Sequence, residues 1–240
     1  MQHQSDLAEL SRTSFDVFAR TAFGIEPGEA VGRQLRAIGS SATLGQGETA
    51  QVSRERDTIV YLSSGATKLA AFASHAREHV VAFHFAGDIV SVPRSGAHSF
   101  ALTALRETEI LLFSAREFFD QAAEVPSIAH AIFERLSVAL HRSRDKAIGL
   151  ACKSASERVA GFLLTMAERI GREAGDHMTV DLPMSRRDIG ASLGLTIETV
   201  SRQFGVLRDA GLIETQGRSI IVLSDLAGLS RRAGTAEPRH

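Results

Sequence analysis

The sequence predicts an α+β protein with an N-terminal β-roll, a long central helix and a C-terminal winged helix-turn-helix. Three observations carry this prediction. Short apolar runs separated by glycines fill residues 43–113. One uninterrupted helical pattern follows Pro126. Two short helical segments, residues 185–194 and 196–211, are joined by a glycine and precede a hairpin pattern that ends by residue 223. Ser185 and Thr196 are their predicted N-caps, and Gly211 is predicted to end the second segment. Many short strands at regular spacing are typical of a sandwich or roll.

The roll is expected to follow a weakly helical start that ends near residue 40. In "HVVAFHF", Val81, Phe83 and Phe85 alternate with Val80, Ala82 and His84, which is the period of a strand. Strands are expected within residues 57–65, 66–72, 79–88, 98–105 and 109–113, with turns at Gly65, Gly87 and Gly96.

The long helix carries a heptad pattern. Its seam consists of Phe133, Leu136, Leu140, Ser143, Ala147 and Leu150, at alternating steps of three and four. Such a seam favours pairing with a second helix, so we expect a homodimer; the alternative is packing on the chain's own roll. The expected domains are residues 1–115 (helical start and roll), 116–152 (dimerisation helix), 153–232 (winged helix-turn-helix) and 233–240 (disordered tail).

Composition excludes several classes of protein. The chain has 240 residues, 44% hydrophobic, with a net charge of −1, so any basic surface for nucleic acid must be local. Residues 182–232 hold seven Arg against five acidic residues. The single cysteine, Cys152, excludes an intramolecular disulfide and an all-cysteine metal site. The sequence has neither a signal-peptide pattern nor a membrane-length apolar run, so we expect a cytoplasmic protein with no membrane partner.

The second helix of the helix-turn-helix has one polar and one apolar face. Glu198, Ser201 and Arg202 share the polar face, and these side chains are suited to reading base edges in the major groove. Ile197, Val200, Phe204 and Leu207 form the predicted apolar face. The alternative is a solvent-exposed face with a Glu198–Arg202 ion pair. The expected phosphate contacts are Ser185, Arg186, Thr196, Thr199 and Arg218.

The segment "LPMSRRDIGASLGLTIETVSRQFGVLRDAGLI" resembles the DNA-binding signature of the CRP/FNR superfamily of bacterial transcription regulators. The triplet Glu198, Ser201 and Arg202 is similar to that of the FNR/FixK branch, whereas Gln203 departs from the aliphatic residue usual in the family. The resemblance implies a cyclic-nucleotide-binding-like roll and a homodimer that binds double-stranded DNA. Its targets would be TTGAT–N4–ATCAA-like inverted repeats. It also implies an activator that contacts RNA polymerase in a micro-oxic or nitrogen-oxide response.

The signal that the roll senses is less clearly indicated. The Gly87–Asp88 turn resembles that of cyclic-nucleotide-binding members, but Val92 stands where they carry a ribose-binding Glu, so no cyclic nucleotide is expected. Too few cysteines are present for an iron–sulfur cluster. A haem-based gas sensor remains an alternative, with His75, His79 and His84 as candidate ligands, and Cys152 is a candidate redox residue.

A further alternative belongs to another class of protein. In it, the roll would bind or convert a small molecule and the helix-turn-helix would contact only other proteins. Our expectation is a regulator that is not an enzyme, with no catalytic residues, no metal site and no resident cofactor.

Overall fold

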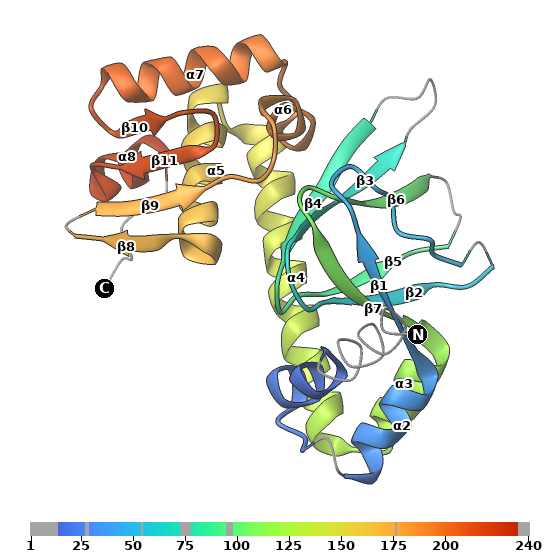
Figure 1. Ribbon diagram of the computed structural model, residues 1–240. Helices are drawn as coiled ribbons and strands as arrows, with labels where there is room; N and C mark the ends of the chain where they lie inside the picture. The colour runs from blue at the N-terminus through green and yellow to red at the C-terminus, as the bar shows by residue number, and fades with distance from the viewer. Residues whose placement is uncertain are drawn as a thin grey trace. The chain divides into compact units, whose positions relative to one another are not determined.

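The computed structural model of the protein (Figure 1) describes residues 14–26, 29–53, 55–72, 78–94, 98–175 and 177–234. The chain forms two compact units, Met1–His141 and Arg142–His240. The first unit contains the β-sheets of the roll, and the second contains the winged helix-turn-helix. The predicted α+β fold is therefore confirmed.

Two antiparallel sheets form the roll. One has the strand order β1-β7-β2-β5 and the other has the order β4-β3-β6. Their strands are β1 Gly39–Leu44, β2 Thr58–Leu62, β3 Ala66–Phe72, β4 Glu78–Phe85, β5 Ile89–Val92, β6 Ser99–Ala104 and β7 Thr108–Ser114. All five predicted strands are confirmed, whereas β1 and β5 were not predicted.

The apolar core of the roll lies between these two sheets. It is a cluster made of Leu44, Ala50, Val60, Leu62, Leu69, Val90, Val92, Leu102, Ala104 and Ile110. Gly65 closes the β2–β3 turn with a φ of 85°, a conformation that glycine adopts without strain. Gly87 has a similar φ of 89°, while the third predicted turn, at Gly96, lies outside the described residues.

Strand β4 departs from strict alternation. The pairing of β3 with β4 shifts between Leu69 and Ala70, so β4 carries a bulge. As a result Val80 is buried together with Phe83 and Phe85, and the prediction that Val81 shares their face is wrong.

A second cluster covers the other face of the first sheet, where the helices lie. Residues 14–23 are helical, and helices α2 Ala30–Ile38 and α3 Ala115–Ala123 follow. Six aromatic residues dominate this cluster: Phe15, Phe18, Phe23, Tyr61, Phe113 and Phe118. Strand β2 therefore has a core on both faces, which explains why all five of its residues are buried.

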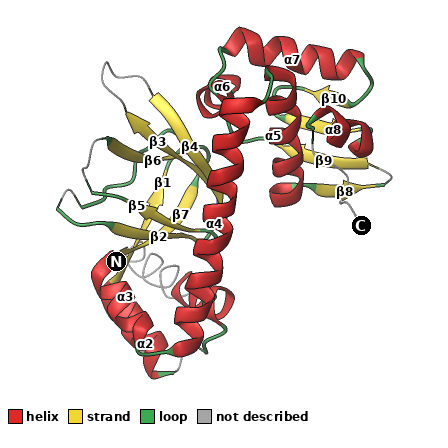
Figure 2. Cartoon of the chain, turned by 180° about the vertical axis from the view of Figure 1, so that it is seen from behind, coloured by secondary structure: helices red, strands yellow, loops and turns green. Residues whose placement is uncertain are grey.

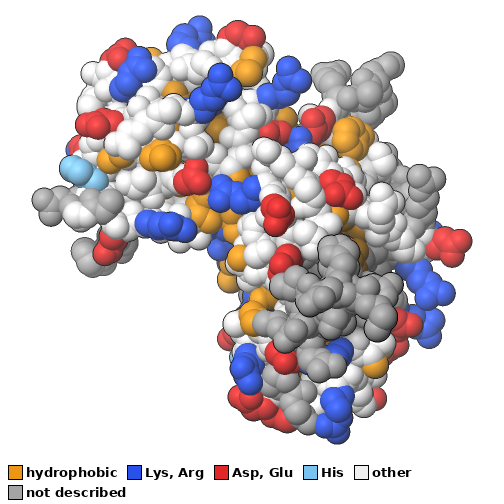
Figure 3. Space-filling view, viewed as in Figure 1, with side chains coloured by type: hydrophobic (Ala, Val, Ile, Leu, Met, Phe, Trp, Pro, Cys, Tyr) orange, Lys and Arg blue, Asp and Glu red, His pale blue; other side chains and the backbone are white. Residues whose placement is uncertain are grey.

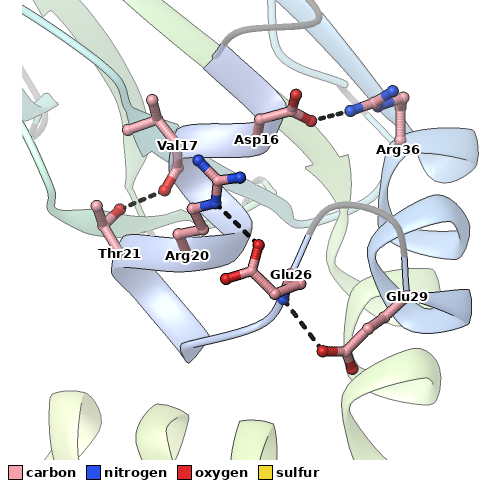
Figure 4. Close-up of polar contacts among 7 residues, drawn as sticks. All are labelled: Asp16, Val17, Arg20, Thr21, Glu26, Glu29 and Arg36. Atoms are coloured by element: carbon pink, nitrogen blue, oxygen red, sulfur yellow. Dashed lines mark hydrogen bonds and ion pairs between the residues drawn. The ribbon is translucent and has the colours of Figure 1, made fainter.

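Ion pairs also link residues within this helical layer (Figure 4). Asp16 pairs with Arg36 of α2, and Arg20 Nε lies 3.3 Å from Glu26 Oε2. These side chains are at least one third exposed, and such pairs contribute little to stability. Apolar packing within the aromatic cluster is therefore the main interaction that holds this layer on the sheet.

Helix α4, Pro126–Cys152, is one continuous helix (Figure 2). Its first half is attached to the roll by the buried Ile128 and by Arg135, which donates hydrogen bonds to the carbonyls of Gly87 and Ala22. The boundary between the two units falls inside α4, at residues 141–142, although residues 116–152 were predicted as a separate segment. The long helix itself begins at Pro126, after α3.

The second unit packs helices on a small sheet of order β10-β11-β9-β8. Its elements are α5 Ala155–Ile170, β8 Arg172–Ala174, β9 His177–Asp181, α6 Arg186–Leu193, α7 Ile197–Asp209, β10 Ile213–Gln216, β11 Ile220–Leu223 and α8 Leu226–Arg232. The predicted tail is wrong at Ala233, which is the C-cap of α8 and is buried. Residues 235–240 lie outside the described residues.

Helix α5 begins with a complete capping box. Ser154 Oγ accepts a hydrogen bond from the Glu157 N–H, and Glu157 accepts one from the Ser154 N–H. We expect Ser154→Ala to lower the free energy of unfolding by ~1 kcal/mol, because the Glu157 N–H loses its partner. Urea unfolding followed by circular dichroism measures this change. An unchanged unfolding midpoint would show that the cap contributes nothing.

Candidate nucleic-acid interface

The two helices of the helix-turn-helix begin at polar caps that the sequence predicts. Ser185 and Asp188 form a complete capping box at the start of α6. Thr196 caps α7 by accepting a hydrogen bond from the Thr199 N–H. At the other end of α7, the Gly211 N–H donates to the Arg208 carbonyl and the Leu212 N–H donates to the Leu207 carbonyl, which is a Schellman motif. The predicted helix ends are confirmed within two residues.

The turn between α6 and α7 is tight. The Leu195 N–H donates to the Gly190 carbonyl at 2.9 Å. A Cβ at Gly190 would lie 2.6 Å from the Leu195 carbonyl oxygen, so a larger residue could not stay there without moving the turn. Gly194 has a φ of 64°, which allows the chain to reverse before Thr196.

Helix α7 buries one face and exposes the other. Val200, Phe204 and Leu207 are buried in the unit, whereas Glu198, Ser201 and Arg202 are exposed. The structure therefore brings the three predicted base-reading residues together on one open face. Among the described residues, no ion pair joins Glu198 to Arg202, so the two charges do not neutralise each other.

Ile197 is a correction to the predicted faces of α7. It was placed with the apolar face, but it is 43% exposed and lies one helical turn before Ser201. The helical period assigned it to the buried side, but it is the first residue of the helix, where no neighbouring element covers it. An exposed aliphatic side chain beside the reading residues is suited to contact with a thymine methyl group.

The carboxyl group of Glu198 is held in its ionised form. Hydrogen bonds from its own backbone N–H and from the Thr196 hydroxyl lower its pKa below the usual value of 4.5. Glu198 is therefore a hydrogen-bond acceptor at neutral and mildly acidic pH. A carboxylate of this kind can accept from a cytosine amino group.

We expect NMR titration of the Glu198 carboxyl to give a pKa below 4.5, and Thr196→Val to raise that pKa towards 4.5. Because the pKa is lowered in the folded state, the stabilisation is present above the ordinary pKa and is lost as pH falls through the lowered one. Thr199→Ser keeps the hydroxyl that lies 3.2 Å from Thr196 Oγ1 and serves as the control. An unchanged Glu198 titration in Thr196→Val would exclude this hydrogen bond as a cause.

Arg186 has a contact that its sequence position did not predict. Its guanidinium carbon lies 3.3 Å from the centroid of the Phe204 ring, so it links the start of α6 to α7 through a cation–π contact. Burial lowers the pKa of Arg186 to about 10, and the side chain remains charged at neutral pH. Its assignment as a phosphate contact stays a prediction.

The other predicted phosphate contacts lie at the ends of elements. Ser185 and Thr196 are exposed caps, Thr199 is half-buried and Arg218 is exposed in the turn between β10 and β11. Lys and Arg side chains are interspersed with Asp and Glu on the surface over α7 (Figure 3). The charges on this surface are therefore mixed, and the predicted phosphate contacts depend on individual arginines and not on a uniformly positive face.

The predicted seam on α4 is open. Phe133, Leu136 and Leu140 are 70%, 55% and 50% exposed. Ser143 and Ala147 are also exposed, whereas Leu150 is half-buried. Ile128 and Arg135 contact the first unit from a different face of α4, so Phe133, Leu136 and Leu140 stay uncovered by the roll. Cys152, the last residue of α4, is an exposed free cysteine.

His84, a candidate haem ligand, and Val92, at the position of the ribose-binding Glu, both lie against other residues of the roll. His84 was placed on the polar side of β4. It lies opposite the fully buried Thr67, on the face that Thr67 shares with Leu69 of the core, and its Nδ1 is 3.7 Å from Asp88 Oδ2. Val92 is buried in the apolar core. His75 lies outside the described residues.

The residues that the structure describes contain no group of three or more His, Cys, Asp or Glu side chains placed to hold a metal ion. Among the same residues, no helix is both long and apolar enough to cross a membrane.

Known proteins share this architecture. Residues 157–232 match the Crp-like helix-turn-helix domain. The chain is 35% identical over 182 residues to the nitrogen fixation regulation protein FixK of Bradyrhizobium diazoefficiens, covering 75% of this chain and 77% of that protein. It is 28% identical over 184 residues to the fumarate and nitrate reduction regulatory protein of Escherichia coli K12, covering 74% of each. The structure of FixK2 from Bradyrhizobium japonicum is similar, with a TM-score of 0.73 and 30% identity over 83% of this chain and 100% of that chain.

Proposed function

The chain belongs to the CRP/FNR family of DNA-binding transcription regulators, in its FixK/FNR branch, and we propose that it reads TTGAT–N4–ATCAA-like inverted repeats as a homodimer. It is a regulator and not an enzyme. The observation that carries the proposed target is the exposed face of α7, with Glu198, Ser201 and Arg202 together. Arg202 would read the G of each half-site, Glu198 the base pairs opposite and Ser201 a T.

The open seam on α4 supports the homodimer. Three large apolar side chains stand exposed on this face, and a second copy of the same helix would cover them by knobs-into-holes packing. A twofold dimer places two copies of α7 one helical turn of DNA apart, as an inverted repeat requires.

We further propose that the protein needs no cyclic nucleotide to bind DNA. The buried Val92 supports this, because an apolar core residue stands where a ribose-binding carboxylate would be needed. An activating role with RNA polymerase, within a micro-oxic or nitrogen-oxide response, is proposed by analogy with relatives. Their names include a transcriptional activator, FnrL, and a fumarate and nitrate reduction regulator.

Fluorescence anisotropy of the purified, ligand-free protein tests the proposed target. A TTGAT–N4–ATCAA duplex is compared with a scrambled duplex at ~150 mM salt, because affinity for DNA depends strongly on salt. We expect the specific duplex to bind ~10³-fold or more tightly than the scrambled one. Equal, weak binding of both duplexes by the ligand-free protein would contradict the proposal. Repeating the measurement on haem-loaded protein would then test the gas-sensor alternative.

A further inference from the structure

Two basic side chains next to the joint between α4 and α5 reach the C-terminal ends of other helices in the second unit. Lys153 directly follows α4, and its Nζ donates to the carbonyl of Ala233, the C-cap of α8, at 2.8 Å. Arg158 lies early in α5, and its Nη1 donates to the carbonyl of Leu193, the last residue of α6, at 2.7 Å. Carbonyls at a helix C-terminus lack partners within the helix and carry partial negative charge, so a cationic donor stabilises each end.

Arg158 also contacts the turn of the helix-turn-helix. A Cβ at Gly194 would lie 3.6 Å from Arg158 Nη1 and 3.4 Å from Leu150 Cδ2. The guanidinium and the leucine side chain therefore pack against the same glycine from α5 and α4. This packing explains why Leu150 is half-buried, although it belongs to the predicted seam.

The position of this contact matters for α7. Leu193 and Gly194 end α6, and Thr196 caps the start of α7. Only Gly194 and Leu195 connect Leu193 to this cap, so their backbone sets the direction of α7. Arg158 is hydrogen-bonded to Leu193, where this connection begins. A shift there would move Glu198, Ser201 and Arg202 together, because all three lie within the first two turns of α7.

We propose that Arg158 is a positioning residue for base reading: it ties the α6–α7 turn to the start of α5, beside the C-terminal end of α4. The proposal rests on the DNA-reading function proposed above. Arg158 does not itself contact DNA in this proposal, and it acts by fixing α7.

Three variants test this role. Arg158→Met removes the charge and the donors but keeps an unbranched side chain. Arg158→Lys restores a cationic donor. Lys153→Met is the matched control, because it removes the equivalent contact at α8, away from the turn. Two readouts are measured: hydrogen exchange of the backbone amides of residues 193–199 in the free protein, and the ratio of affinities for specific and scrambled duplexes.

For Arg158→Met we expect faster exchange at residues 193–199, with exchange in α5 unchanged, and a roughly tenfold lower affinity ratio. Affinity for the scrambled duplex and the salt dependence should stay the same, because no phosphate contact is lost. Arg158→Lys should restore most of both readouts, and Lys153→Met should keep the affinity ratio.

Two results would overturn the proposal. One is an Arg158→Met protein with unchanged exchange at the turn and an unchanged affinity ratio. The other is an equal loss on both duplexes with a salt slope reduced by about one, which would make Arg158 a phosphate contact. If the unmodified protein itself bound both duplexes equally, the proposed target would fail. The exchange data would then still decide whether Arg158 holds the turn.

Discussion

Arg202→Ala is expected to weaken binding to the specific duplex by ~1–3 kcal/mol per half-site and to remove the preference for G. The reason is geometric. Arg202 is exposed on α7 with Glu198 and Ser201, and its forked guanidinium can bond the O6 and N7 atoms of guanine together. The measurement is anisotropy on the specific duplex and on duplexes with each half-site G replaced.

Two further variants separate base reading from charge. Arg202→Lys keeps the positive charge but not the fork, so the salt slope should persist while the preference for G is weakened. Arg208→Ala is the control, because Arg208 is an exposed arginine of the same helix that is not among the predicted base-reading residues. Its Nε lies 3.5 Å from Asp209 Oδ1. If Arg202→Ala lost affinity equally for the scrambled duplex, Arg202 would be a phosphate contact and the assignment would be wrong.

Leu140→Glu is expected to convert the protein to monomers. Leu140 is 50% exposed in the middle of the seam on α4, and in a dimer the introduced carboxylate would be buried against its own copy. A monomer binds each half-site alone, so affinity for the full inverted repeat should fall roughly 100-fold or more. Analytical ultracentrifugation measures the first effect and anisotropy measures the second.

Val138→Glu is the matched control for the seam. It introduces the same charge on the same helix two residues away, on a different face, at a residue that is 48% exposed. It should remain dimeric and bind the repeat normally. A Leu140→Glu protein that stays dimeric at micromolar concentration would exclude this seam as the interface.

Local signals were sufficient for much of the fold. Short apolar runs separated by glycines located β2, β3, β4, β6 and β7, and the caps at Ser185 and Thr196 located the starts of α6 and α7. The polar face of α7 followed from the helical period. These features depend on residues within one or two turns of each other, which a sequence displays directly.

Features that depend on distant residues were missed. Strand β1 reads "GSSATL", which has no strand pattern of its own, and it forms because it pairs with β7. The bulge in β4 shifts which of Val80 and Val81 is buried. The helical layer is held by aromatic residues from Phe15 to Phe118, whose contacts no local period reveals.

The sequence by itself determined the α+β layout, the helix-turn-helix with its caps, and the three residues that share the polar face of α7. Only the tertiary structure decided that Ile197 is exposed, that Arg186 stacks on Phe204 and that Arg158 caps α6 from 35 residues away. The physical reason is the range of the interactions. Caps and periods act between neighbours along the chain, whereas burial and long side-chain contacts exist only once separate elements have packed together.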